Sequence, residues 1–227
     1  RTISWNVKTM DAKMKGMIMA GMMAISLVLG AIAIFSNSWL TLEEDDNGME
    51  SVTNTGLSNT ELIIDAPDAD SCKAGAEFYE DELDGAEAEC DGKELTVTVG
   101  ISDLCEAYDD DTMSDDAKDD LDDCEAAASA GTMGQIGMWG GVVFALLATL
   151  MMVLPMAGVD ALDAIPEMGQ KVISWGAGGL MLLGMVLWYF MLPDGDSSMA
   201  MGCVMAGAAM SLALGSTLIG QFIPADE

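Results

Sequence analysis

The sequence predicts a membrane all-α four-helix bundle with a small disulfide-bonded α+β extracellular domain inserted between helices 1 and 2. Three observations support this: four long uncharged apolar runs, an acidic segment between the first two runs, and four cysteines within that segment. Hydrophobic residues make up 51% of the chain although its net charge is −30. Both values fit one chain because 30 of its 38 acidic residues lie between Thr41 and Ala130.

Each apolar run is long enough to cross a membrane, since about 20 helical residues span a hydrocarbon core of about 30 Å. The first run is longer than the roughly 7–15 apolar residues of a signal peptide, so we favour a retained helix over a cleaved one. The predicted spans are residues 16–35, 134–159, 172–192 and 198–223. The remaining segments are a cytoplasmic N-terminal segment (1–15), the acidic extracellular domain (36–133), a cytoplasmic loop (160–171), a short extracellular loop (193–197) and a cytoplasmic tail (224–227).

The basic residues predict the orientation in the cell membrane. Lys and Arg in short flanking segments favour the cytoplasmic side of a span. Lys13 and Lys15 precede the first run, and Lys171 precedes the third. We therefore expect a multi-pass protein with both termini in the cytoplasm and residues 36–133 outside the cell.

Small residues recur at every fourth position in two of the spans. They let helix backbones approach closely where lipid supplies no hydrophobic drive to associate. We expect these stripes to be packing seams, either within one chain or between chains. The seam residues are Gly137, Gly141 and Ala145 in the second span, and Cys203, Gly207, Ser211 and Gly215 in the fourth.

The acidic segment carries the signals of a small sheet covered by one or two helices. Strands are predicted where apolar and polar residues alternate: Trp39–Leu42, Met49–Thr53, Glu61–Ile64 and Leu95–Ile101. One helix is predicted at Ala74–Glu89. A second starts near Ser114, runs through Cys124 and breaks near Gly131 before the second span.

A small polar domain of this kind usually needs disulfides because its core is small. Cys72, Cys90, Cys105 and Cys124 allow three pairings. We favour Cys72–Cys90 with Cys105–Cys124, because each pair brackets a compact segment. A four-thiolate metal site is the weaker alternative, since the chain has no Cys-x-x-Cys spacing.

The acidic residues suit solvation in a saline medium, a basic partner or weak divalent cation binding. No stretch has the acid spacing and central glycine of an EF-hand loop. The weak cation candidates are Asp109, Asp110, Asp111, Asp119, Asp120, Asp122 and Asp123. No cofactor is expected.

The layout resembles the claudin-like tetraspan group. Trp39, just after the first run, looks like the early loop tryptophan of that group, and Gly56-Leu57 looks like the start of its Gly-Leu-Trp signature. Ser58 stands where that signature has Trp, and four loop cysteines replace two. The resemblance implies four spans, internal termini and a disulfide-bonded sheet in the first extracellular loop, and we take from it the fold and not the function.

These observations predict a non-enzymatic integral membrane protein with an adhesive, assembly or auxiliary role through its acidic extracellular domain. The predicted spans contain no Asp, Glu, Lys or Arg, which proton relays and ion-coupled transport need, and the chain has no histidine. The alternative is a small oligomeric cation channel or transporter with an acidic vestibule. The expected partners are the lipid bilayer and other membrane or extracellular proteins, including further copies of this chain. Nucleic acid is excluded by charge.

Overall fold

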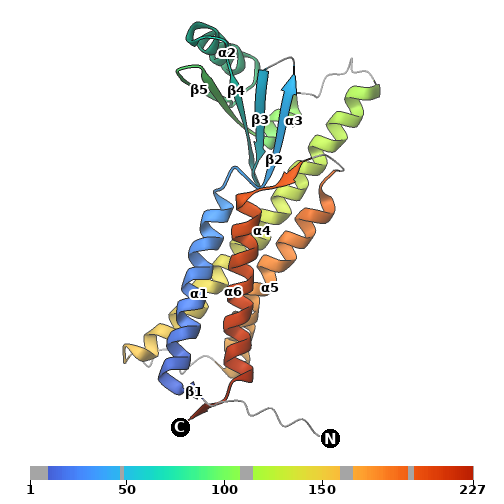
Figure 1. Ribbon diagram of the computed structural model, residues 1–227. Helices are drawn as coiled ribbons and strands as arrows, with labels where there is room; N and C mark the ends of the chain where they lie inside the picture. The colour runs from blue at the N-terminus through green and yellow to red at the C-terminus, as the bar shows by residue number, and fades with distance from the viewer. Residues whose placement is uncertain (1–9, 47–48, 108–114, 159–165, 194–196, 227) are drawn as a thin grey trace, which may run out of the picture. The chain divides into compact units, whose positions relative to one another are not determined.

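The computed structural model describes residues 10–46, 49–107, 115–158, 166–193 and 197–226. The chain forms two compact units. The helical unit comprises Arg1–Ala31, Gly137–Leu183 and Met205–Glu227, and the sheet unit comprises Ile32–Ile136 and Gly184–Val204. Within these described residues, four helices are long and apolar enough to cross a membrane (Figure 1): α1 (Ala12–Ile34), α4 (Asp115–Met156), α5 (Glu167–Met191) and α6 (Met201–Phe222).

The helices of the helical unit pack through small residues. A Cβ added to Gly30 of α1 would lie 3.0 Å from Val142 of α4 and 3.1 Å from Met181 of α5. The same Cβ would lie 3.9 Å from Ala209 of α6. All four helices therefore meet at Gly30, where the absent side chain allows the close approach.

Every buried hydroxyl described in this unit is hydrogen-bonded to a main-chain carbonyl. Ser26 donates to the carbonyl of Ala209 at 2.7 Å, and Ser216 donates to that of Met19 at 3.0 Å. Thr217 donates to the carbonyls of Ser174 and Ala213. These bonds join α1 to α6 and α5 to α6, as expected where no water is available to satisfy a polar group.

The two ends of the helical unit's chain lie together. Strand β1 (Met10–Asp11) pairs in parallel with β8 (Ala225–Asp226). The ammonium group of Lys15 donates to the carbonyls of Gly220 and Ile223 at 2.9 and 2.6 Å. Because the last carbonyls of a helix have no partner within it, Lys15 caps the C-terminus of α6 and complements its dipole.

The sheet unit contains a six-stranded antiparallel sheet in the order β5-β6-β4-β3-β2-β7. Its strands are β2 (Leu40–Asp46), β3 (Met49–Thr55), β4 (Asn59–Asp65), β5 (Glu87–Asp91), β6 (Glu94–Gly100) and β7 (Ser198–Met199). The register places Leu62, Val97 and Ala88 side by side on one face. We call this the apolar face; the opposite face carries residues such as Glu61, Thr98 and Glu87.

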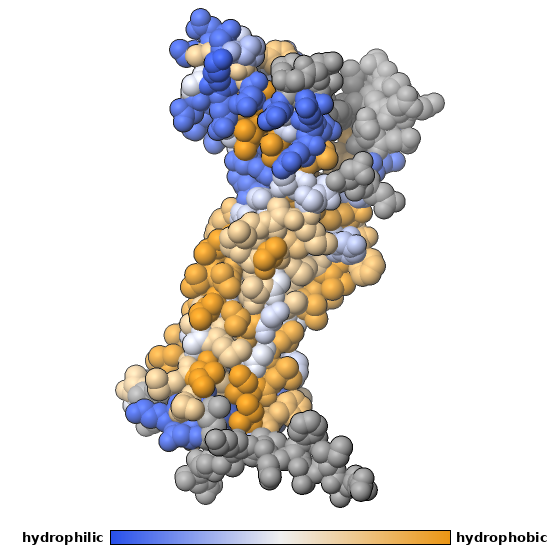
Figure 2. Space-filling model, in the orientation of Figure 1, coloured by the Kyte–Doolittle hydropathy of each residue, from blue (hydrophilic) through white to orange (hydrophobic). Residues whose placement is uncertain are grey.

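The hydropathy of the surface differs between the two units, as the sequence predicted. Hydrophobic residues dominate the surface of the long helices, and hydrophilic residues dominate that of the strands and α2 (Figure 2). Among the hydrophilic atoms of the sheet unit a hydrophobic patch is nevertheless visible (Figure 2).

Two expectations for the helices of this unit were wrong. The helix expected at Ala74–Glu89 is α2 (Ala69–Glu82), and Glu87–Asp91 is a strand instead. Gly85, with a φ of +77°, turns the chain between them, a conformation that glycine adopts without strain. A third helix, α3 (Ile101–Ala107), follows β6 directly.

The expected break near Gly131 is also absent, because α4 runs without interruption through that residue. The glycine has a different role: a Cβ there would collide with the carbonyl oxygen of Leu57. Ser198 and Met199, expected as the start of the fourth span, form β7, which pairs with Leu40 and Thr41 of β2. The fourth long helix begins only at Met201.

Candidate functional site

The sheet unit is held together by two disulfides, Cys72–Cys90 and Cys105–Cys124. The first joins α2 to β5, and the second joins α3 to α4, which confirms the favoured pairing. Cys72 is fully buried, and with buried Leu95 and Val97 it forms a small core cluster of the unit. A Cβ added to Gly75 would lie 3.0 Å from the side chain of Leu95, so the glycine lets α2 approach β6 closely. The covalent bonds thus compensate for a core of few residues.

The start of α2 is fixed by local hydrogen bonds. Asp68 has extended backbone angles, and its side chain accepts a hydrogen bond from the amide of Ser71 at 2.8 Å. This N-cap satisfies an otherwise unpaired donor. The hydrogen bonds from Ser71 hold the pKa of Asp68 below its ordinary value, because they stabilise the ionised carboxylate.

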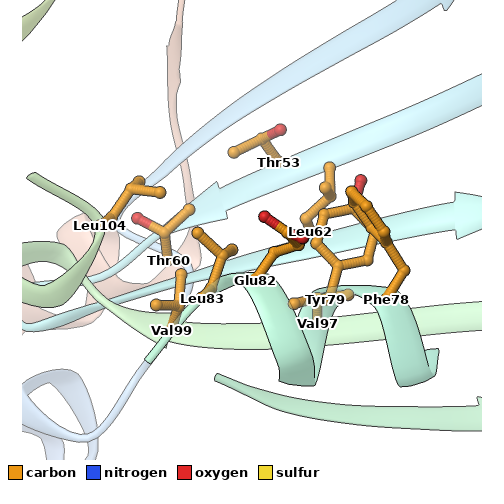
Figure 3. A pocket seen from close by; sticks show the side chains of 10 residues that line it. All are labelled: Thr53, Thr60, Leu62, Phe78, Tyr79, Glu82, Leu83, Val97, Val99 and Leu104. Carbon is orange, nitrogen blue, oxygen red and sulfur yellow. The ribbon is translucent and has the colours of Figure 1, made fainter. Parts of the chain in front are cut away.

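An open pocket of about 500 Å³ lies on the apolar face of the sheet, beside α2. It exists because α2 packs on β5 and β6 at one edge of this face. Figure 3 shows side chains from the strands, α2 and α3 converging on the space that α2 leaves open. The lining residues are Thr53, Thr60, Leu62, Phe78, Tyr79, Glu82, Leu83, Val97, Val99 and Leu104.

The lining combines an apolar floor with polar groups at a few points. Leu62, Val97 and Val99 supply the floor from β4 and β6. Phe78 is 58% exposed, and its ring contacts that of Tyr79 in an edge-to-face arrangement with centroids 5.6 Å apart. Glu82 is the only charged residue among the described residues of the lining. The pocket can thus hold an apolar group next to one carboxylate, in the manner of many binding sites.

Most of the cation candidates lie outside what the structure describes. Asp109, Asp110 and Asp111 lie outside the described residues, and the side chains of Asp119 and Asp120 are not described either. Asp122 and Asp123 lie on α4 and are exposed. Among the described residues, no group of three or more Cys, Asp or Glu side chains is arranged to hold a metal ion.

The stripe in α4 lies at a helix contact. Ala145 is fully buried, and a Cβ on Gly141 would lie 2.8 Å from the carbonyl oxygen of Ala177 in α5. Gly137 is half-buried at the end of this stripe. The seam is therefore between helices of one chain.

The stripe in α6 is only partly buried. Cys203 is buried, whereas Gly207 and Gly215 are half-buried and Ser211 is exposed. The hydroxyl of Ser211 donates to the carbonyl of Gly207 within α6. The buried face of α6 is offset from the expected stripe and consists of Ala206, Ala209, Ala213, Ser216 and Thr217.

Trp39 and Leu57, which were singled out by the family resemblance, lie in one buried cluster of the sheet unit. Trp39 is fully buried, and its indole N–H donates to the carbonyl of Ala33 at 2.7 Å. Its ring meets that of Trp188 edge to face, with centroids 5.0 Å apart. A Cβ on Gly134 would lie 2.8 Å from Leu57 and 3.4 Å from Trp188. Both tryptophans are thus packing residues here.

The sequence interpretation missed the pocket, although two signals point to it. Phe78 and Tyr79 stand next to each other in a helix that otherwise reads as acidic and small. Leu62 and Ile64 stand two residues apart after polar Glu61 and before polar Asp65, a spacing that places both on one face of a strand. What the sequence does not show is that α2 sits at the edge of the sheet.

These features define the architecture of a multi-pass membrane protein: four candidate spans and a disulfide-bonded sheet between the first two. Neither a protein-family model nor a curated protein matches the chain.

Proposed function

We propose that the protein is a non-enzymatic integral membrane protein whose sheet unit makes contact with another protein, in an adhesive, assembly or auxiliary role. The observation that carries this proposal is the open apolar pocket in a covalently braced, strongly acidic unit. A pocket on a rigid scaffold is a usual place for recognition. The helical unit supports the same view, because its described buried hydroxyls bond to main-chain carbonyls.

The proposed orientation places residues 36–133 outside the cell and both termini in the cytoplasm. The pairing of β1 with β8 supports a common side for the two termini. The basic residues Lys13, Lys15 and Lys171 support the cytoplasm as that side. The claudin-like layout remains part of the proposal at the level of topology.

Photo-crosslinking in native membranes tests the proposed function. A photoreactive residue replaces Glu80, which is exposed on α2, and in a matched variant it replaces Glu167, which is exposed at the start of α5. We expect a specific protein adduct from position 80 and none from position 167. Recovery of monomer alone from position 80 would contradict the proposal.

Protease protection tests the orientation separately. Protease added to sealed cells should cut within residues 36–133 and leave residues 160–171 intact. Permeabilised cells serve as the control, because both segments then become accessible. Protection of residues 36–133 in sealed cells, with cleavage after permeabilisation, would reverse the assignment of sides.

A further inference from the structure

We propose that the pocket beside α2 binds an apolar side chain of a basic polypeptide segment, with Glu82 and the surrounding acids pairing with lysine or arginine on either side of it. This inference rests on the proposed function and deepens it by naming the chemistry of the partner. It commits to a polypeptide rather than to a metal ion, a nucleic acid or a second copy of this chain.

The shape and lining of the pocket favour an anchoring side chain. Its volume of about 500 Å³ lies in the range of small binding sites. Its wall includes the exposed ring of Phe78, and its floor is formed by Leu62, Val97 and Val99. Aromatic and aliphatic anchors that fill such pockets carry most of the free energy of binding in protein interfaces. One tryptophan or leucine of a partner is therefore the fitting occupant.

The charge around the pocket selects a basic partner. Besides Glu82, the exposed acids Glu77, Glu80 and Asp81 lie on the same helix. In the same sheet, exposed Glu44 of β2 lies on the apolar face, the face that carries the pocket. Such a field attracts cationic segments, speeds their association and repels another copy of a chain with net charge −30.

The test uses the full chain in nanodiscs of zwitterionic lipid and three fluorescent peptides. The first peptide has a central tryptophan between pairs of lysines. The second replaces this tryptophan by alanine, and the third replaces the lysines by glutamates. Binding is measured by fluorescence anisotropy at about 0.15 M salt, with empty nanodiscs as the control for lipid binding.

We expect the lysine–tryptophan peptide to bind at least tenfold more tightly than the alanine peptide, because only the first buries a large apolar side chain. The glutamate peptide should not bind. At molar salt the advantage of lysine should shrink through screening, while the advantage of tryptophan persists.

Two variants and their matched controls locate the site. Phe78→Ala removes a wall of the pocket and should weaken the tryptophan peptide about tenfold. Glu82→Gln should weaken it about threefold, as one exposed ion pair does. The controls are Val52→Ala and Glu89→Gln on the opposite face of the sheet, which should change binding less than twofold. Circular dichroism checks that Phe78→Ala folds, which its 58% exposure leads us to expect.

The outcomes separate this inference from the proposed function. Equal binding of the tryptophan and alanine peptides would contradict the pocket as the binding site. An equal loss of affinity in the variants and their controls would contradict it as well. Binding of the glutamate peptide would contradict the claim that the partner is basic. If none of the peptides bound, the whole inference would be contradicted. Under any of these results, a specific crosslink from position 80 would still support the proposed contact role.

Discussion

The two units of this protein achieve stability in different ways. In the helical unit, small residues bring backbones together and the described buried hydroxyls bond to carbonyls of other helices or of their own. In the sheet unit, two disulfides join the elements, and part of the apolar face stays open beside α2. The contrast fits helices suited to lipid, where an unsatisfied polar group is costly, and a covalently braced sheet suited to water, where an uncovered apolar face is tolerated.

The largest effect expected from this contrast is on the disulfide of the core. Replacing both Cys72 and Cys90 by serine should lower the free energy of unfolding of the sheet unit by about 3 kcal/mol. The reason is that the cross-link between two residues 18 positions apart no longer restricts the unfolded chain. Hydrogen exchange of peptides from α2, β5 and β6 should accelerate about 100-fold, while exchange in α5 stays unchanged.

The matched control is Cys203→Ala, which removes a buried thiol that forms no disulfide. It should leave exchange in α2, β5 and β6 unchanged. If the double serine variant destabilised α5 as much as the sheet, the two units would not be separately stabilised.

The next effect concerns the contact between α4 and α5. Gly141→Ala should destabilise the helical unit by about 2 kcal/mol, because the new methyl group meets Met181 and the carbonyl of Ala177. The measurement is unfolding in detergent followed by tryptophan fluorescence. Gly179→Ala is the control on α5: nothing lies within 4 Å of its added Cβ, so helix propensity should make it neutral or slightly stabilising. If both variants lost the same stability, the close contact between α4 and α5 at Gly141 would be refuted.

A smaller effect is expected from the hydroxyl of Ser26. Ser26→Ala removes the hydrogen bond to Ala209 and should cost about 0.5–1 kcal/mol in the same detergent assay. Ser211→Ala removes only a bond within α6 from an exposed position and should have almost no effect. A larger loss for Ser211 than for Ser26 would place the important contact on the other face of α6.

The smallest effect is the pH dependence of α2. Because folding lowers the pKa of Asp68, its cap contributes stability that is present above the ordinary value of 3.8 and is lost as the pH falls through the lowered pKa. Amide exchange at the start of α2 should therefore accelerate below about pH 4 relative to its intrinsic rate. Asp68→Asn keeps a capping oxygen but does not titrate, so it should abolish this acid-dependent change.

Much of the fold could be predicted because it depends on whether each segment is apolar or hydrophilic. Apolar runs without charge give long helices, and the alternation in Leu95–Ile101 predicts the strand β6, which has one buried face and ends at Gly100. Cysteine spacing was enough to favour the pairing that the structure forms. Each of these signals is local in the chain.

The features that were missed depend on contacts between distant segments. Glu87–Asp91 is a strand because it pairs with β6 and because Cys90 is bonded to Cys72. Gly131 reads as a helix breaker, yet it serves the close approach of Leu57. The packing face of α6 is set by Ser26 and Met19 of α1, which no pattern within α6 reveals. The pocket was missed for the same reason.

The pairing of β7 with β2 has a consequence for biogenesis. Leu40 and Thr41 emerge early in synthesis, but their partners at the sheet edge are Met199 and Ser198, which the ribosome delivers only after the third long helix. Until then the β2 edge has no neighbour on that side. A chain truncated before Ser198 would therefore expose a sheet without its edge strand to the cell's quality-control proteases, even with both disulfides formed.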